Sequence, residues 1–319
     1  LCTIGLNIYL YTIVPKGFFP IQDTGRLSGT IQADQSISSQ AMQKKLADFV
    51  AILHQDPEIE TVIGFTGGQR STNTGRMFAT LKPLEERQLS VDKLMTRLRG
   101  KLKNEPGAQL ILQSPQDLRI GARGSSALFE YSLQADNLEE LRTWVPQIVK
   151  ALSKRTELVD VNTNQQDNGQ QISLQVDRDL SSGLGLSQTQ INSTLNNAFG
   201  QRQISLIYNS LNQYRVIMEV TPEFSQSAET LKNIYINAPA VPQLTSRGQI
   251  PFSTFVTYST TNTPLSVNHQ SQFPAGTISF NLKPGTSLST ASQAITETMS
   301  NLGVPASIHG SFQGTAKAF

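Results

Sequence analysis

The chain has 319 residues, of which 38% are hydrophobic and 16% charged, with a formal net charge of +2. This composition is typical of a folded protein, and the length allows two or three small domains. Basic residues form no run of five or more, so nucleic acid is not expected as a partner. The single cysteine, Cys2, excludes a disulfide within the chain and a zinc site built from cysteines.

The N-terminal stretch up to Val14 is almost uncharged and rich in Leu, Ile and Tyr. A membrane-spanning helix needs roughly 20 apolar residues, so the stretch is too short to span a bilayer by itself. Lys16, followed by the aromatic pair Phe18 and Phe19, is typical of a segment at a membrane surface. Residues 1–22 are therefore interpreted as the end of a transmembrane helix with a membrane-exit segment. A buried strand is the alternative.

Four stretches of the sequence share the order strand, helix, strand. In each, apolar residues alternate with polar ones and then recur at helical spacing. The first two stretches predict a split βαβ, or ferredoxin-like, subdomain over residues 23–120. The third closes with a strand around residues 172–176, and the fourth follows after an insert. Together they predict a second ferredoxin-like subdomain from residues 121–176 and 267–319.

The insert, residues 177–266, has the pattern of a small α+β domain. Ser187 and Gln190 predict a capping box at the start of a helix that ends at Gly200. Two strands joined by a polar turn are predicted at 206–208 and 214–220, and a loop at 238–246. The predicted fold class is therefore α+β, with two ferredoxin-like subdomains, the second of them interrupted by a small α+β domain.

No enzyme motif is present. The sequence has no Gly-x-Ser-x-Gly elbow, no phosphate-binding loop and no His-Glu-x-x-His motif. The histidines His54, His269 and His309 lie far apart in the sequence. We therefore expect no catalytic residue, no metal site and no cofactor.

The stretch from Gly64 to Pro83 holds the most unusual chemistry. It begins with three glycines in five residues, which allows backbone conformations that other residues rarely adopt. Phe65 and Phe78 flank its polar middle, and a mobile aromatic loop is suited to apolar ligands of varied shape. The alternative is a plain hairpin between two strands. The following strand, residues 109–114, is expected to run beside the loop and to supply the opposite wall.

Several strings, in the right order, resemble the second large periplasmic loop of resistance-nodulation-division (RND) efflux pumps. The similarity runs over essentially the whole chain. Residues 15–25 are similar to the exit from the seventh membrane helix, and 64–83 to the switch loop of the family. The segments 197–200 and 212–216 resemble the docking domain, and 312–316 the approach to the eighth membrane helix.

The resemblance implies a trimeric inner-membrane multidrug exporter driven by proton flow, of which this chain would be a periplasmic portion. The ferredoxin-like subdomains would be porter subdomains, and the insert a docking domain. The implied partners are amphiphilic small molecules such as drugs and bile salts, a periplasmic adaptor protein and an outer-membrane channel. The trimer would be a homotrimer or would include a paralogous pump subunit, and segments flanking this chain would hold it in the membrane. The proton-relay residues would lie outside this chain.

The resemblance also implies a set of substrate-binding residues. They are Phe65, Thr66, Gly67 and Gly68 in the switch loop, Phe78, then Leu110, Leu112 and Ser114 on the next strand, with Asn162 and Asn164 in the second subdomain. Well-studied drug pumps have a second phenylalanine at Gly67, aromatic residues at Leu110 and Leu112, and a basic residue at Asn162. The less aromatic, less charged pocket favours bile-salt-like amphiphiles over flat aromatic drugs.

Two other functions remain open. A metal-ion exporter of the same family would need methionine or acidic clusters facing the pocket, whereas most of the five methionines lie on core stripes. A protein-interaction module of the same fold would bind no small amphiphile and would not need Phe65.

Overall fold

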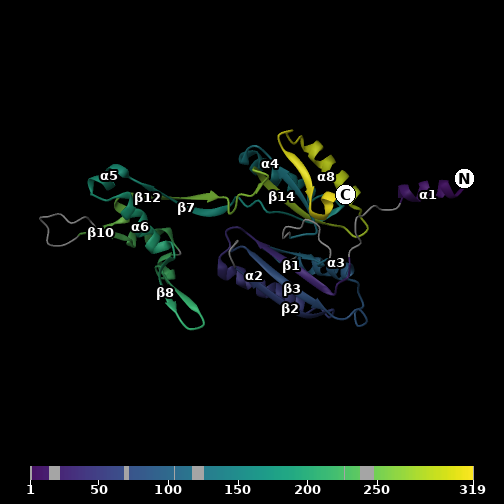
Figure 1. The fold of residues 1–319 in the computed structure, drawn as a ribbon, viewed down its shortest axis with the longest axis horizontal. Helices are drawn as coiled ribbons and strands as arrows, with labels where there is room; N and C mark the ends of the chain where they lie inside the picture. The colour runs from purple at the N-terminus through teal and green to yellow at the C-terminus, as the bar shows by residue number, and fades with distance from the viewer. Residues whose placement is uncertain are drawn as a thin grey trace. The chain divides into compact units, whose positions relative to one another are not determined.

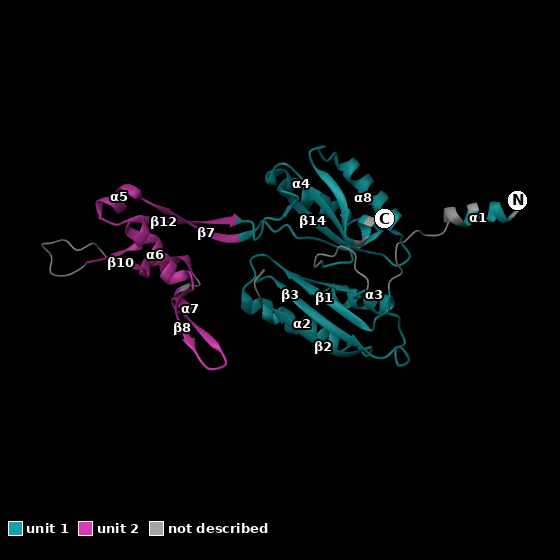
Figure 2. Cartoon of the chain, in the orientation of Figure 1, with its two compact units in different colours: residues 1–169, 263–319 teal, residues 170–262 magenta. Residues whose placement is uncertain are grey.

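The computed structural model describes residues 2–13, 22–67, 72–103, 105–116, 126–225, 227–237 and 248–318. The chain divides into two compact units (Figure 2). One consists of residues 1–169 and 263–319, and the other of residues 170–262. The second unit is the insert, with boundaries a few residues earlier than the 177–266 expected from the sequence.

The first subdomain has the strand order β2-β3-β1-β4, with every neighbouring pair antiparallel. This is the order of a ferredoxin-like sheet, in which two helices cover one face (Figure 1). Its apolar core lies between that face and the helices. The elements are β1 (Arg26–Ala33), α2 (Ser39–His54), β2 (Ile59–Thr66), β3 (Thr74–Leu81), α3 (Val91–Leu102) and β4 (Ala108–Gln113).

The second subdomain repeats this plan, with β6 and β5 on either side of β14 and β15 beyond β5. Asn137 caps α4 by accepting a hydrogen bond from the Glu139 amide at 3.0 Å, as the sequence predicts. The second subdomain has an apolar core of its own, which lies beneath α4 and α8. The elements are β5 (Phe129–Gln134), α4 (Leu138–Leu152), β6 (Leu158–Thr163), β13 (His269–Gln270), β14 (Phe273–Leu282), α8 (Leu288–Leu302), β15 (His309–Gln313) and a closing 3-10 turn, η3 (Gly314–Ala318).

One strand lies elsewhere than the sequence pattern predicts. The strand around residues 172–176 was expected to close the third strand–helix–strand stretch, but β6 occupies that place. The strand itself, β7 (Gly169–Val176), pairs with β12 (Val256–Thr263) in a two-stranded sheet of the second unit. Both runs alternate in polarity, so only the long-range pairing distinguishes them.

The second unit has a small core around Ile191 and Phe252. The predicted capping box of Ser187 and Gln190 is present at the start of α6, and Gly200 is its C-cap. The loop expected at 238–246 lies outside the described residues. The remaining elements are α5 (Arg178–Gly183), α6 (Gln188–Phe199), β8 (Arg202–Tyr208), β9 (Gln213–Met218), α7 (Pro222–Ser225), η1 (Ala228–Asn233), β10 (Tyr235–Asn237), β11 (Gln249–Pro251) and η2 (Phe252–Thr254).

The N-terminal stretch forms a helix, α1 (Cys2–Ile13), so the alternative of a buried strand is wrong. Its apolar side chains Ile4, Leu6 and Tyr9 are exposed. Within the described ranges, no helix combines the length and the apolar character needed to cross a membrane.

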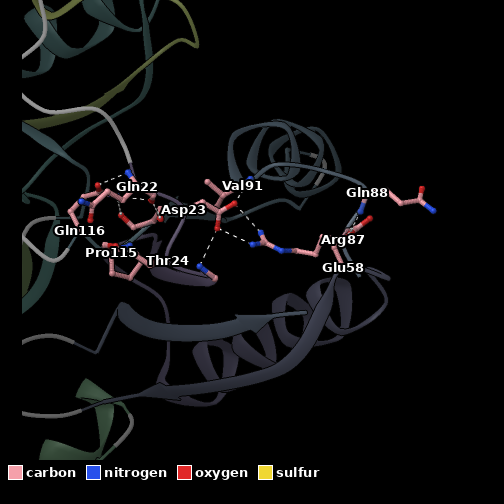
Figure 3. A network of polar contacts seen from close by, with 11 residues as sticks. Gln22, Asp23, Thr24, Glu58, Arg87, Gln88, Val91, Pro115 and Gln116 are labelled. Carbon is pink, nitrogen blue, oxygen red and sulfur yellow. Dashed lines mark hydrogen bonds and ion pairs between the residues drawn. The ribbon is translucent and has the colours of Figure 1, made fainter. Parts of the chain in front are cut away.

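The segment that follows the N-terminal stretch is fixed to the first subdomain through Asp23 (Figure 3). The Asp23 carboxylate accepts hydrogen bonds from both terminal nitrogens of Arg87, at 3.0 and 3.1 Å, and from the Val91 amide at 3.3 Å. Burial by itself raises the pKa of the Asp23 carboxyl, but these hydrogen bonds and the Arg87 charge hold it below the ordinary value. The Gln22 amide also donates to Gln116 Oε1 at 2.8 Å, which ties this segment to the end of β4.

A buried carboxylate, Asp56, anchors α3 to the turn before β2. Its side chain is 0% exposed and forms ion pairs with Arg97 and, at 3.0 Å, with Lys101 Nζ. Burial alone raises the pKa of the Asp56 carboxyl. The hydrogen bonds from Lys101 and the Glu58 amide, together with the charges of Arg97 and Lys101, outweigh this effect, so the pKa lies below its ordinary value. Because the pKa in the folded state is depressed, this contribution to stability is present above the unfolded-state value and is lost as the pH falls through the folded-state pKa.

We expect Asp56→Asn to lower the local stability of α3 by about 2 kcal/mol at neutral pH, because a buried charge-assisted network loses its centre. Hydrogen exchange of the α3 amides measures this loss, which should shrink as the pH approaches the folded-state pKa. Glu139→Gln is the matched control, because Glu139 pairs with Arg142 while its side chain is 70% exposed. That pair should contribute less than about 0.5 kcal/mol. Equal effects of the two substitutions would contradict the anchoring role.

Candidate functional site

The first sheet presents one face to its helices and a second, open face away from them. The antiparallel register arranges the open-face residues in rows that cross all four strands. One row consists of Phe65, Arg76, Thr30 and Ile111, from β2 to β4. The adjacent row consists of Ile63, Phe78, Ser28 and Gln113. In both rows the residue on β4 is buried and the residue on β2 is exposed.

An exposed aromatic pair lies at the β2–β3 side of this face. The rings of Phe65 and Phe78 have centroids 6.1 Å apart and planes tilted by 31°. Phe65 is 50% exposed, Phe78 47% and the neighbouring Ile63 67%. Contiguous exposed apolar side chains on a sheet mark a binding surface more often than isolated ones do. Phe78 lies on a strand, as the sequence predicts, and Phe65 lies on the paired strand and not in the mobile loop that we expected.

The other switch-loop residues lie at the end of this hairpin. Thr66 is the last residue of β2, is half-buried and pairs with Gly75. Gly67 has a φ of +84°, in the left-handed region that favours glycine. Gly68 lies outside the described residues. Gly67 therefore allows the left-handed conformation, whereas Gly64 lies within β2 and packs against Leu46 and Met77. The aromatic rings are positioned by strand pairing.

Leu110 and Leu112 lie on the opposite face of the sheet from the aromatic pair. They are 5% and 1% exposed and belong to the core under the helices. Our expectation that they form a wall opposite Phe78 is therefore wrong, because strand alternation places Ile111, and not its neighbours, on the open face. Ser114, which follows β4, is fully buried and donates its hydroxyl to the Gln22 carbonyl at 3.1 Å.

The two predicted asparagines lie in the second subdomain, and one of them contacts the open face. Asn162 Nδ2 donates to Gln32 Oε1 of β1 at 2.9 Å. Gln32 belongs to the open face and pairs with Thr74 in the row next to that of Arg76. Asn164 is exposed and accepts a hydrogen bond from the Thr277 amide at 2.7 Å, which fixes it to β14. The structure thus brings Asn162, but not Asn164, against the sheet that carries the aromatic pair.

Polar contacts join the two subdomains elsewhere as well. Asp160, which has a φ of +55°, accepts hydrogen bonds from Arg99 Nε at 2.7 Å and from Asn281 Nδ2 at 2.8 Å. Asn281 also donates to the Leu112 carbonyl of β4 at 3.3 Å. The fully buried Asn73 donates to Gln166 Oε1 at 2.9 Å. These contacts bring the second subdomain against α3, β4 and the turn before β3, while Phe65 and Phe78 remain exposed.

Arg76 and Ile63 are the site residues that sequence reasoning missed. Both share the open face with the aromatic pair, and both are exposed. The signal was present in the sequence, because Arg76 is two residues before Phe78 and Ile63 two before Phe65. Side chains two residues apart on a strand point to the same face.

The metal-ion alternative requires a cluster of metal-ligating side chains. Among the residues that the structure describes, no group of three or more His, Cys, Asp or Glu side chains is placed to hold a metal ion. Met42, Met77 and Met95 are buried in the first core.

The whole chain, residues 1–319, matches the model of the AcrB/AcrD/AcrF family, and the protein therefore belongs to that family. It is 53% identical over 320 residues to the multidrug resistance protein MdtC of Cronobacter sakazakii and 51% identical to MdtC of Yersinia pseudotuberculosis. The segments 32–38, 64–68, 165–169, 196–205 and 264–270 also resemble the MdtB/MdtC branch of these pumps, and MdtC more than MdtB. The resemblance to RND multidrug pumps and to MdtC is confirmed. Each alignment covers 100% of this chain but 30% of the relative, so the chain spans about a third of the length of these relatives.

Two solved structures share the fold. Both are crystal forms of a heavy metal efflux pump, with TM-scores of 0.84 and 0.86 over 98% and 99% of this chain and 33% of theirs. At 18% sequence identity, this likeness supports the α+β fold class and says nothing about what this chain binds.

The assignment of Leu112 to the core generates a prediction. We expect Leu112→Ala to destabilise the first subdomain by about 3 kcal/mol, because it leaves a cavity under the helices. Phe78→Ala, which truncates a 47% exposed ring, should cost about 1 kcal/mol or less. Hydrogen exchange of β1 and β4 amides compares the two variants. A larger loss in Phe78→Ala than in Leu112→Ala would contradict the assignment of faces.

Proposed function

We propose that this chain is the periplasmic substrate-binding and docking portion of a proton-driven multidrug exporter of the inner membrane. It captures amphiphilic compounds, including drugs and bile salts, which then pass to an outer-membrane channel. The observation that carries the proposal is the exposed pair of Phe65 and Phe78 on the open face of the first sheet. Membership of the AcrB/AcrD/AcrF family and the identity to MdtC support it.

The chemistry of the open face suits amphiphiles of varied shape. The aromatic rings offer apolar surface without fixing a pattern of hydrogen bonds, so the face does not demand one ligand geometry. The neighbouring Thr30 and Ser28 on β1 supply hydroxyl groups beside the rings. A compound with an apolar body and a polar edge therefore finds complementary groups on adjacent strands.

The second subdomain forms the other side of the proposed substrate route. A hydrogen bond between Asn162 and Gln32 joins it to the first sheet, and the apolar cores of the two subdomains remain separate. Polar interfaces within a chain permit relative motion of the parts they join more readily than large apolar ones. The proposed transport requires such motion, because ligand must enter and leave the face.

The second unit carries a hairpin that suits a protein partner. Within the part of the chain that the structure describes, strands β8 and β9 form a two-stranded sheet of their own, and they expose apolar residues along their length. Tyr208 is 69% exposed and Leu211, in the turn, is 91% exposed. We assign this hairpin to docking with the periplasmic adaptor or the outer-membrane channel. The pump would be a trimer, with three identical subunits or with a paralogous subunit.

Removal of the aromatic pair tests the proposed substrate site. A full-length pump that carries this chain as its matching segment, with any required partner subunit, would be expressed in cells without their main exporters. We expect Phe65→Ala combined with Phe78→Ala to lower resistance to bile salts and novobiocin by about tenfold, because the apolar contact area is lost. Leu84→Ala is the control, since Leu84 is 66% exposed in the same subdomain but outside the open face. Unchanged resistance in the aromatic variant, at equal protein level and trimer assembly, would overturn the proposal.

A second test addresses docking. In the same pump, Leu211→Ser combined with Tyr208→Ser should reduce chemical cross-linking to the adaptor and channel by about tenfold, since exposed apolar side chains at an interface centre carry much of its energy. Ligand binding at the first sheet should remain unchanged. Ile172→Ser, which changes a 47% exposed residue on β7, is the matched control. Full cross-linking in the hairpin variant would remove the hairpin from the docking surface.

A further inference from the structure

We propose that Arg76 makes the aromatic face selective for amphiphiles with a single anionic head group, a carboxylate or sulfonate. This inference rests on the proposed function, because it names the class of ligand that the same face prefers. The arginine was not among the residues that the family resemblance implied. Its place in the strand register is what points to a role.

Arg76 lies within the aromatic patch. In the register it stands opposite Phe65 on β2, and side chains of such pairs have Cβ atoms about 5 Å apart. Phe78 is two residues further along β3 on the same face, about 7 Å away. A ligand whose apolar body covers the two rings therefore brings its polar edge to the guanidinium.

The guanidinium of Arg76 is available for a ligand. The side chain is exposed, and it forms no ion pair or hydrogen bond with any residue in the described ranges. Three other arginines of this subdomain are engaged: Arg87 with Asp23, Arg97 with Asp56 and Arg99 with Asp160. Arg76 thus differs from them in having no carboxylate partner.

The electrostatics of the open face favour an anion. No Asp or Glu occupies an open-face position that the register assigns on β1, β2, β3 or β4, whereas Arg26 and Arg76 both do. Glu60, at the bulge of β2, is five residues from Phe65, about 16 Å along the strand. Since the face carries positive charge only, a cationic ligand meets repulsion there and an anionic one attraction.

The chemistry of arginine defines the ligand class further. A guanidinium presents a planar set of donors that matches a carboxylate or sulfonate in a bidentate arrangement. Beside an apolar surface, part of the ion pair is shielded from water, which strengthens it compared with a fully solvated pair. The preferred ligand therefore combines a rigid or flexible apolar body with one terminal anion.

The test uses surfactants that share a dodecyl-type tail and differ in head charge. In the full-length pump that carries this chain, resistance would be measured to lauroylsarcosinate, dodecyl maltoside and dodecyltrimethylammonium. We expect Arg76→Gln to lower resistance to the anionic lauroylsarcosinate by about fivefold and to change the other two by less than about twofold. Arg76→Lys should retain part of the anion resistance, because it keeps the charge but not the bidentate donor set.

Arg26→Gln is the matched control, since it removes the same charge from the same face. Arg26 pairs with Thr80, two rows from the row of Arg76, and it forms no ion pair with a described residue. It should lower the lauroylsarcosinate resistance by less than about twofold, because Arg26 adds to the positive field but lies too far from the rings to pair with a head group above them. An equal loss of resistance to all three surfactants in Arg76→Gln, or no loss for the anion, would overturn the anion preference.

The double variant Phe65→Ala with Phe78→Ala separates this inference from the proposed function. If it leaves resistance to all three surfactants unchanged, the proposed substrate site itself fails. If that pair lowers all three while Arg76→Gln does not discriminate, only the anion preference fails.

Discussion

The antiparallel register of the first sheet is the constraint on which the candidate site depends. Because side chains alternate along a strand, the register that buries Met77 under the helices also presents Arg76 and Phe78 on the open face. A slip of one residue would bring the Arg76 charge into the apolar core without a partner, at a cost of several kcal/mol. The packing of α2 and α3 thus positions the aromatic pair without touching it.

Polar contacts, and not strand register, join the two ferredoxin-like subdomains. Each has its own apolar core, and hydrogen bonds and ion pairs join the two, among them Asn73 with Gln166 and Arg99 with Asp160. Buried polar contacts of this kind specify one arrangement while contributing less net stability than apolar packing of the same area. Polar contacts thus specify the arrangement, and a join of this kind suits the relative motion that the proposed transport requires.

The features that the sequence predicted well are local ones. The caps at Asn137 and Ser187 depend on residues within one helical turn, and the helix stripes depend on spacing alone. The features that it predicted poorly depend on pairing between distant segments. Leu110 and Leu112 alternate as expected, but the face they occupy is set by β1, and the partner of β7 is more than 80 residues away. Phe65 was assigned to a loop because its glycine neighbours suggested one, although it pairs across the hairpin with Arg76.

The face has few means of selecting a ligand by shape. Two exposed phenylalanine rings accept apolar bodies of many outlines, and discrimination by an apolar surface amounts to a few kcal/mol at most. Charge is then the available means of selection. Asn162 of the second subdomain is neutral and engaged with Gln32. Arg76 places a cation on the first sheet, in the row next to that of Gln32. The positive charge of the proposed site therefore lies on the first sheet, beside the aromatic pair.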